Sequence, residues 1–290
     1  MTERPVIDVA LVRRLVDAQF PEYRGLPVRP VELDGWDNRT FRLGDDLSVR
    51  LPSARGYLGQ VAKEHEWLPR LAPLLPLPIP APVAQGEPDA GYPFPWSVYR
   101  WLPGTPLALA GEVDGVALAT DLGRFLTALR QADATGGPPP GSHNFFRGDP
   151  PGVYRDEAIA AMAAGAPDID PRAARRIWDA AEGSRWDAPG VWFHGDAAPG
   201  NLLVRDGCLS AVIDFGTSGV GDPACDLVPA WTMFDDSARR AFRDAVALDD
   251  ATWARARGWA LWKALITVRD RPDDALARRT LARLAADPGL

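Results

Sequence analysis

Three polar side chains with complementary chemistry lie close together in one part of the chain. Asp196, Asn201 and Asp214 all fall within residues 191–226. A carboxylate can accept the proton of a hydroxyl group as its oxygen attacks a phosphoryl group, and an amide oxygen with a second carboxylate forms a typical Mg²⁺ site. We therefore expect phosphoryl transfer, with Asp196 as the catalytic base and Asn201 and Asp214 as the metal ligands.

Two strand-like runs in this segment position the expected metal ligands. Leu202–Val204 and Leu209–Ile213 are apolar and are joined through Arg205-Asp206-Gly207, which is typical of a hairpin turn. Folding about this turn brings Asn201 beside Asp214, with their backbones roughly 5 Å apart. The expected base precedes the hairpin in a loop rich in Gly and Pro, from which it would overlook the metal.

The overall composition is that of an ordinary globular protein. The 290 residues are 46% hydrophobic and 24% charged, which excludes the disordered and fibrous classes and allows two domains. A net charge of -7 argues against a nucleic-acid partner. The same charge is compatible with a cationic substrate, although solubility alone is the better explanation of it.

Cysteine and histidine usage excludes several kinds of site. Cys208 and Cys225 provide neither a disulfide framework nor a CxxC metal pattern, which favours the reducing cytoplasm. With only His65, His143 and His194 present, no zinc cluster is expected. Because no signal peptide or long apolar stretch occurs, we expect no membrane partner.

The remaining patterns predict the elements that carry these residues. Apolar periodicity predicts helices over Ile7–Phe20, Gln60–Leu71, a segment with Leu118, Leu122, Phe125 and Leu129 on one face, Val153–Ala164, Pro171–Glu182, and from Asp236 onward. Short apolar runs predict three strands between Val28 and Leu51 and another over Trp96–Trp101. We expect an extended connector over Leu75–Val83, which alternates with proline, and a loop over Ala134–Gly152.

These residues together resemble a known family. His194-Gly195-Asp196, then Asn201, then Ile213-Asp214-Phe215-Gly216 resemble the catalytic and metal motifs of the aminoglycoside phosphotransferase family, relatives of the protein kinases. Gly221-Asp222-Pro223 with Asp226-Leu227 resembles that family's next signature, and matching features extend over residues 31–231. By this resemblance His194 and Asp226 support the loop and take no part in the chemistry.

The resemblance implies an α+β, protein-kinase-like fold with two lobes. The N-terminal lobe, residues 1–99, would hold an antiparallel sheet with helices and bind the nucleotide. Residues 100–104 would form a hinge, and residues 105–290 a larger, mainly helical C-terminal lobe that carries the catalytic residues and binds the substrate.

The same resemblance assigns a site for ATP or GTP. The loop Gly35-Trp36-Asp37-Asn38 would cover the phosphates, and main-chain groups of Arg100 and Leu102 would bond the purine. Arg50 would grip the phosphates and pair with Glu64, at a position where kinases normally place Lys. Lys63 is the obvious alternative, but as the neighbour of Glu64 on a helix it should point elsewhere.

The acceptor is the least determined part of the prediction. The resemblance places it in the second lobe, where acidic and aromatic candidates are Asp156, Glu157, Trp231, Phe234, Asp235 and Asp236. Acids suit a cationic antibiotic such as an aminoglycoside, and aromatic groups suit a flatter acceptor. A housekeeping amino alcohol or sugar, and a nucleotide-binding regulatory protein, stay open as alternatives. We expect a monomer or weak dimer.

Overall fold

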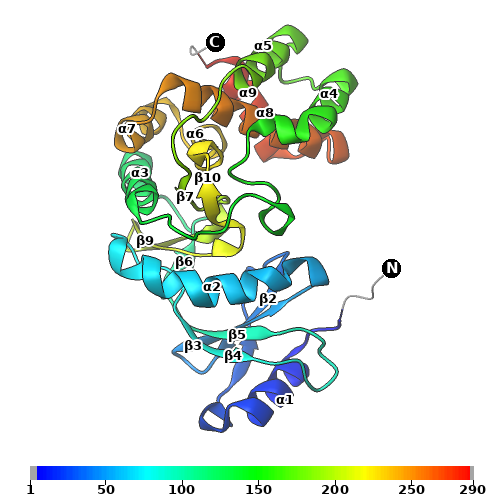
Figure 1. Cartoon of the computed structure of the whole chain (residues 1–290), viewed down its shortest axis with the longest axis vertical. Helices are drawn as coiled ribbons and strands as arrows, with labels where there is room; N and C mark the ends of the chain where they lie inside the picture. The colour runs from blue at the N-terminus through cyan, green and yellow to red at the C-terminus, as the bar shows by residue number, and fades with distance from the viewer. Residues whose placement is uncertain (1–4, 288–290) are drawn as a thin grey trace. The chain divides into compact units, whose positions relative to one another are not determined.

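The computed structural model describes residues 5–287, which form two compact units. The first unit contains the described residues up to Gly111 together with Gly200–Asp206 and Ser210–Gly216, and the second contains the rest. An antiparallel sheet with helices in the first unit and a mainly helical second unit confirm the predicted α+β, kinase-like fold class (Figure 1). The predicted lobe limits, with a hinge at residues 100–104, stay a prediction.

The first unit is built on a five-stranded antiparallel sheet with the order β1-β2-β3-β5-β4. Its strands are β1 (Val28–Pro30), β2 (Asn38–Leu43), β3 (Leu47–Pro52), β4 (Pro82–Gly86) and β5 (Trp96–Arg100). The three strands expected between Val28 and Leu51 and the strand beginning at Trp96 are therefore present. The extended connector over Leu75–Val83 runs directly into β4, an edge strand that the sequence analysis did not anticipate because proline masks it.

Two helices accompany this sheet. Helix α1 (Val9–Gln19) begins after Asp8, whose carboxylate caps it by accepting from the Leu11 amide at 2.7 Å. Its buried residues join those of the sheet in one apolar core. Helix α2 (Leu58–Leu71) starts two residues earlier than predicted and buries Glu64 to 4% exposure. Burial of a carboxylate is costly unless the group is paired or hydrogen-bonded, so we expect Glu64 to contact a charged or polar partner.

The predicted hairpin is present and contributes to a second, smaller sheet. Strands β8 (Leu202–Arg205) and β9 (Cys208–Val212) follow one another, and β6 (Thr105–Pro106) pairs with β8. The turn places Asp206 and Gly207 in left-handed conformations, with φ of 52° and 78°. Asp and Gly tolerate that region better than other residues, which is why this sequence turns here.

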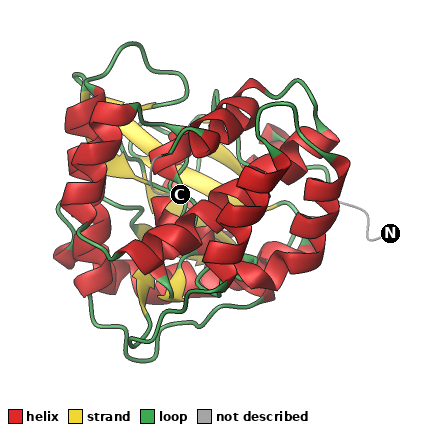
Figure 2. Cartoon of the chain, turned by 90° about the horizontal axis from the view of Figure 1, so that it is seen from above, coloured by secondary structure: helices red, strands yellow, loops and turns green. Residues whose placement is uncertain are grey.

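The second unit consists mostly of helices, drawn in red in Figure 2. They are α3 (Gly115–Gln131), α4 (Arg155–Ala164), α5 (Pro171–Glu182), α6 (Pro229–Thr232), α7 (Asp236–Val246), α8 (Asp250–Asp270) and α9 (Ala275–Ala285). The four apolar residues that predicted α3 are all buried. A small antiparallel pair, β7 (Val191–Phe193) with β10 (Gly219–Gly221), supports the loop that carries Asp196.

Helix α8 forms the centre of this unit and fixes the segment after β10. Arg255 on α8 donates through Nε to Oδ2 of Asp222 at 2.6 Å, and both side chains are almost fully buried. Short 3-10 turns complete the structure, at Pro21–Tyr23, Arg55–Tyr57, Ala72–Leu74, Ser142–Asn144, Pro151–Tyr154, Pro199–Asn201, Phe215–Thr217 and Pro223–Leu227. Within residues 5–287, no helix has the length and apolar character needed to cross a lipid bilayer.

Candidate active site

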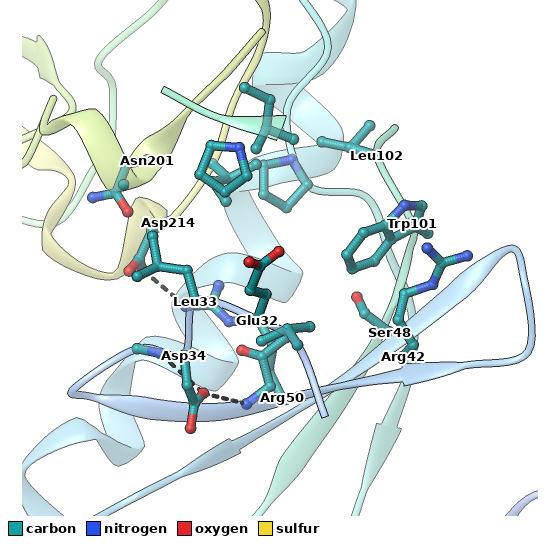
Figure 3. A pocket seen from close by; sticks show the side chains of 18 of the residues that line it. Glu32, Leu33, Asp34, Arg42, Ser48, Arg50, Trp101, Leu102, Asn201 and Asp214 are labelled. Carbon is teal, nitrogen blue, oxygen red and sulfur yellow. Dashed lines mark hydrogen bonds and ion pairs between the residues drawn. The ribbon is translucent and has the colours of Figure 1, made fainter. Parts of the chain in front are cut away.

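A cavity of about 550 Å³ lies within the first unit (Figure 3). Asn201 and Asp214 lie at one end, and Trp101, Leu102 and Arg42 lie at the other. The lining combines charged groups with apolar surface, which is the usual character of a small-molecule site. The cavity therefore collects predicted residues from the sheet, the segment after β5 and the hairpin.

The sheet contributes one polar face to this cavity. Thr40 pairs with Arg50 and Arg42 pairs with Ser48 across β2 and β3, and all four line the cavity. Residues two apart on a strand share a face, so one register determines all four positions. Arg42 lies over the ring of Trp101 at 4.1 Å, a contact that the sequence analysis missed.

The hairpin brings the two expected metal ligands to the same end of the cavity. The amide of Ile213 donates to the carbonyl of Asn201 at 2.8 Å, and Asp214 follows directly in a left-handed conformation with φ of 65°. Both side chains line the cavity. An amide oxygen and a carboxylate oxygen are hard donors of the kind that Mg²⁺ prefers, so Asn201 and Asp214 are the residues that would hold it.

Arg50 connects this end of the cavity to helix α2. Its Nη2 lies 2.8 Å from Oδ1 of Asp214, and its Nη1 lies 3.4 Å from Oε1 of Glu64. Tyr99 donates its hydroxyl hydrogen to the other oxygen of Glu64. Desolvation tends to lower the pKa of Arg50, but Asp214 and Glu64 outweigh it and raise the pKa. Arg50 is therefore a permanently charged fork held between two carboxylates.

Lys63 also reaches the segment after the hairpin, contrary to the expectation that it would point away. Its ammonium donates to the carbonyl of Gly216 at 2.7 Å. Desolvation lowers the pKa of Lys63 to about 8, although Glu64 and Asp214 act in the opposite direction. The structure thus assigns the carboxylate pairing to Arg50 and a backbone contact to Lys63.

The predicted phosphate loop is only partly exposed to the cavity. Gly35 and Asn38 line it, whereas Trp36 and Asp37 do not. Trp36 is 71% exposed, and Asp37 accepts a hydrogen bond from Gln60 of α2 at 3.1 Å. Their role as direct nucleotide ligands stays a prediction. Asp34, which directly precedes this loop, accepts from the amides of Gly35 and Thr40 and so shapes the loop.

The predicted hinge residue Leu102 lies at the opposite end of the cavity from Asp214 (Figure 3). Arg100 and Leu102 both line it. The Arg100 amide already donates to the carbonyl of Ala81 at 2.9 Å, so among its main-chain groups the carbonyl is the one suited to a ligand. Glu32 and Leu33 lie across the cavity between the two ends (Figure 3), and nothing in their local sequence pattern indicated this.

Asp196 belongs to the second unit, where hydrogen bonds to a buried carboxylate fix the backbone of its loop. The carboxylate of Asp226 accepts from the amides of His194 at 2.8 Å and Gly195 at 2.7 Å. Burial raises the pKa of Asp226, against the lowering effect of these amides. His194 is fully buried, and its Nδ1 accepts from the amide of Asp196 at 3.2 Å. These contacts orient the backbone and leave the Asp196 side chain exposed.

Gly195 is required by the shape of this loop. Its φ is 84°, and an added Cβ would come within 2.7 Å of the carbonyl oxygen of Thr217. A side chain there would meet immobile backbone, so only glycine fits beside Asp196. Its carbonyl accepts from Nε of Arg147 at 3.1 Å, a contact that the sequence analysis did not foresee.

The residues predicted to bind the acceptor differ in their burial and in their contacts. Trp231 and Phe234 are core residues with 0% and 2% exposure, which leaves little of either side chain accessible, and their contact with an acceptor stays a prediction. Asp235 caps α7 by accepting from the Ala238 amide, and Asp236 pairs with Arg239. These contacts give both acids structural roles.

The two acids of α4 lie in its first turn. Asp156 is exposed, and Glu157 accepts from the Trp262 indole at 2.8 Å. As acceptor contacts, the four acids Asp156, Glu157, Asp235 and Asp236 stay predictions. Glu157 thereby connects α4 to aromatic side chains of α8 that the sequence analysis did not consider.

The chain is similar to known proteins in sequence and in fold. Residues 28–259 match the model of a family described as the phosphotransferase enzyme family. The structure resembles the GDP complex of wild-type aminoglycoside 2'-phosphotransferase-IIIa, with 19% identity, coverage of 97% of this chain and 99% of the other, and a TM-score of 0.69.

Two further solved structures are similar. Macrolide 2'-phosphotransferase MphH from Brachybacterium faecium, an apoenzyme, is 25% identical, with coverage of 97% and 99% and a TM-score of 0.62. The streptomycin–ATP ternary complex of APH(2")-IIa is 16% identical, with coverage of 98% of both chains and a TM-score of 0.58. No curated protein matches the chain.

Proposed function

Since the chain belongs to the phosphotransferase enzyme family, we propose that it transfers the γ-phosphoryl group of ATP or GTP to a hydroxyl group of a small molecule, with Asp196 as the base. The observation that carries this proposal is the position of Arg50. It links Asp214 and Glu64 in a cavity that Asn201 also lines. A charged fork beside two hard oxygen donors is the arrangement that phosphoryl transfer needs.

The cavity supports one orientation of the nucleotide. Its apolar end, formed by Trp101 and Leu102, suits the purine, and the Arg100 carbonyl can accept a hydrogen bond from it. Its charged end, formed by Arg50, suits the phosphates. Similar structures hold GDP or ATP, as their names state, which supports a purine nucleotide as the donor.

The chain's own residues would divide the chemistry between them. Asn201 and Asp214 would hold Mg²⁺, which when bound neutralises negative charge on the phosphates. Arg50 would orient the phosphate oxygens through its two nitrogen donors. Asp196, exposed on a loop fixed by Asp226, would accept the hydroxyl proton of the acceptor.

Antibiotic-like acceptors are the first to test, because similar structures carry the names of aminoglycoside and macrolide phosphotransferases. Antibiotic modification in the cytoplasm would then be the biological role. A housekeeping hydroxyl compound such as a sugar is a second candidate, favoured by Arg147, which contacts Gly195, and by Lys263, which interacts electrostatically with Asp196.

The test is direct measurement of phosphoryl transfer. The purified chain is incubated with Mg²⁺ and ATP or GTP labelled at the γ-phosphate, together with aminoglycosides, macrolides, sugars and amino alcohols. Transfer of label to any acceptor, lost on Asp196→Asn substitution, supports the proposal. Nucleotide binding without transfer to any acceptor would favour a regulatory protein in its place.

A further inference from the structure

Three aromatic side chains of the second unit form one cluster between α8 and the segment before α4. The rings of Tyr154 and Trp262 stack at 4.0 Å, and Trp259 meets both of them edge to face at 5.9 and 5.6 Å. Tyr154 is half-buried, whereas Trp259 and Trp262 are 2% and 5% exposed. In this cluster the two tryptophans are therefore buried, and Tyr154 is the member that is partly accessible to a ligand.

Arg147 ties this aromatic cluster to the loop that carries Asp196. Its guanidinium lies 4.9 Å from the ring of Trp259 and 5.5 Å from that of Trp262. Its Nε donates to the carbonyl of Gly195, the residue before Asp196, at 3.1 Å. A cation is therefore fixed in place beside the proposed base by both hydrogen bonding and cation–π attraction.

A second cation, Lys263, occupies the same neighbourhood. It follows Trp262 on α8, its side chain is exposed, and its ammonium lies 5.9 Å from the Trp262 ring. Partial desolvation and Arg147 lower the pKa of Lys263, whereas Asp196 raises it. Lys263 thus lies within electrostatic range of both Arg147 and Asp196.

Glu157 is the other acid that acts on Lys263, more weakly than Asp196 does. Glu157 accepts from the Trp262 indole at 2.8 Å and faces Arg269 at 3.9 Å. Its charge is therefore partly balanced by Trp262 and Arg269, and it acts on Lys263 only in part. A ligand bound at Asp196 would therefore lie in the field of two positive charges as well as that of the carboxylate.

We propose that Arg147 and Lys263 select an acceptor whose part nearest the reacting hydroxyl is uncharged or anionic, and that they disfavour polyamines. This inference rests on the proposed function, because it takes Asp196 as the base. An ammonium placed beside two fixed cations is repelled, whereas a carboxylate or a neutral polyol can hydrogen-bond to them. The substrate class is thus a neutral or acidic hydroxyl compound, with the aromatic edge available to its apolar face.

Matched probes that differ in charge test this directly. Kanamycin and its fully N-acetylated form share their rings and hydroxyls, but only kanamycin carries the amine charges. Glucosamine and glucuronate make a second pair. Binding of each to the full chain is measured by titration calorimetry, which does not require turnover. We expect the uncharged or anionic member of each pair to bind more tightly, by on the order of tenfold.

Charge reversal at Lys263 supplies the decisive comparison. Lys263→Glu should invert the order of affinities within each pair, and Lys263→Gln should reduce the difference. Arg172→Glu, at an exposed position on α5, introduces the same change of charge elsewhere and should leave the order unchanged. Near-ultraviolet circular dichroism verifies that each variant retains its tertiary structure.

The outcomes separate this inference from the proposed function. Tighter binding of the cationic probes, equal affinity within both pairs, or a Lys263→Glu effect no larger than that of Arg172→Glu would overturn the inference. Nucleotide binding and phosphoryl transfer are measured on the same samples. Phosphoryl transfer with a preference for polyamines would contradict only the inference about the acceptor. Failure to bind any nucleotide would contradict the proposed function.

Discussion

Arg50 lies 2.8 Å from Asp214, although the two residues are 164 positions apart in the chain. The same guanidinium also faces Glu64, so one side chain holds a carboxylate from the hairpin segment and another from α2. Kinases normally place Lys at this strand position. A Lys is a point charge, whereas the Arg fork can contact both carboxylates and phosphate oxygens at once.

Arg50→Gln should weaken nucleotide binding by about 10- to 100-fold, because it leaves two carboxylates facing the phosphates without a cation. Arg50→Lys should recover part of this loss, since it restores the charge without the fork. Calorimetric titration with ATP and GTP measures both effects. Arg13→Gln, an exposed change on α1, serves as the control. Unchanged affinity in Arg50→Gln would mean that the nucleotide binds elsewhere.

Asp196→Asn should lower kcat by about 100- to 10,000-fold, because the amide cannot accept the hydroxyl proton. Nucleotide affinity should change little, since Asp196 is assigned to the acceptor. Steady-state kinetics with the preferred acceptor measure the effect. Asp206→Asn makes the same chemical change in the exposed hairpin turn and should be neutral. A variant at position 196 with nearly normal kcat would show that another group is the base.

Asp214→Asn should abolish the dependence of nucleotide binding on Mg²⁺, because it replaces the carboxylate ligand with a weaker neutral donor. Binding of ATP is compared with and without the metal for the native chain and the variant. In the native chain, removal of the metal with a chelator should weaken binding strongly. If the variant responded to Mg²⁺ as the native chain does, Asp214 would not be a ligand.

Asp249→Ala should destabilise the chain by about 1 kcal/mol at pH 7, because Asp249 caps α8. Its carboxylate accepts from the Thr252 hydroxyl and amide, and these hydrogen bonds lower its pKa. The capping contribution is therefore fully present above about pH 4 and is lost as the pH falls through the lowered pKa.

Urea unfolding of the native chain and Asp249→Ala across this pH range measures the cap. The two should converge in stability at low pH. Asp250→Ala, which removes an exposed partner of Arg243, should cost less than 1 kcal/mol. A difference between native chain and Asp249→Ala that stayed constant with pH would exclude the capping explanation.

Much of the proposed site was visible in the sequence because its parts are local. The turn at Gly207 and the flanking apolar runs predicted the hairpin, and the glycine before Asp196 marked a loop. Such features depend on hydrogen bonds and backbone preferences over a few residues. The alternation of Thr40 with Arg42 and of Ser48 with Arg50 could also have revealed the polar face of the sheet, had the register been assigned.

Other properties depended on contacts between distant segments. Trp231 had the chemistry of a binding residue, but packing against Trp253 removed it from solvent. Arg147 gave no local signal, because its importance lies in contacts with Gly195 and with α8. Burial and side-chain pairing are consequences of packing between remote parts of the chain, which periodicity does not encode.

By itself, the sequence determined the family-like motifs, the class of chemistry and the hairpin that carries Asn201 and Asp214. The tertiary structure alone decided that Arg50 pairs with both Asp214 and Glu64, and that cations stand beside Asp196. The physical reason is that backbone geometry is set largely by neighbouring residues, whereas the electrostatic surroundings of a side chain are set by whatever the fold packs against it.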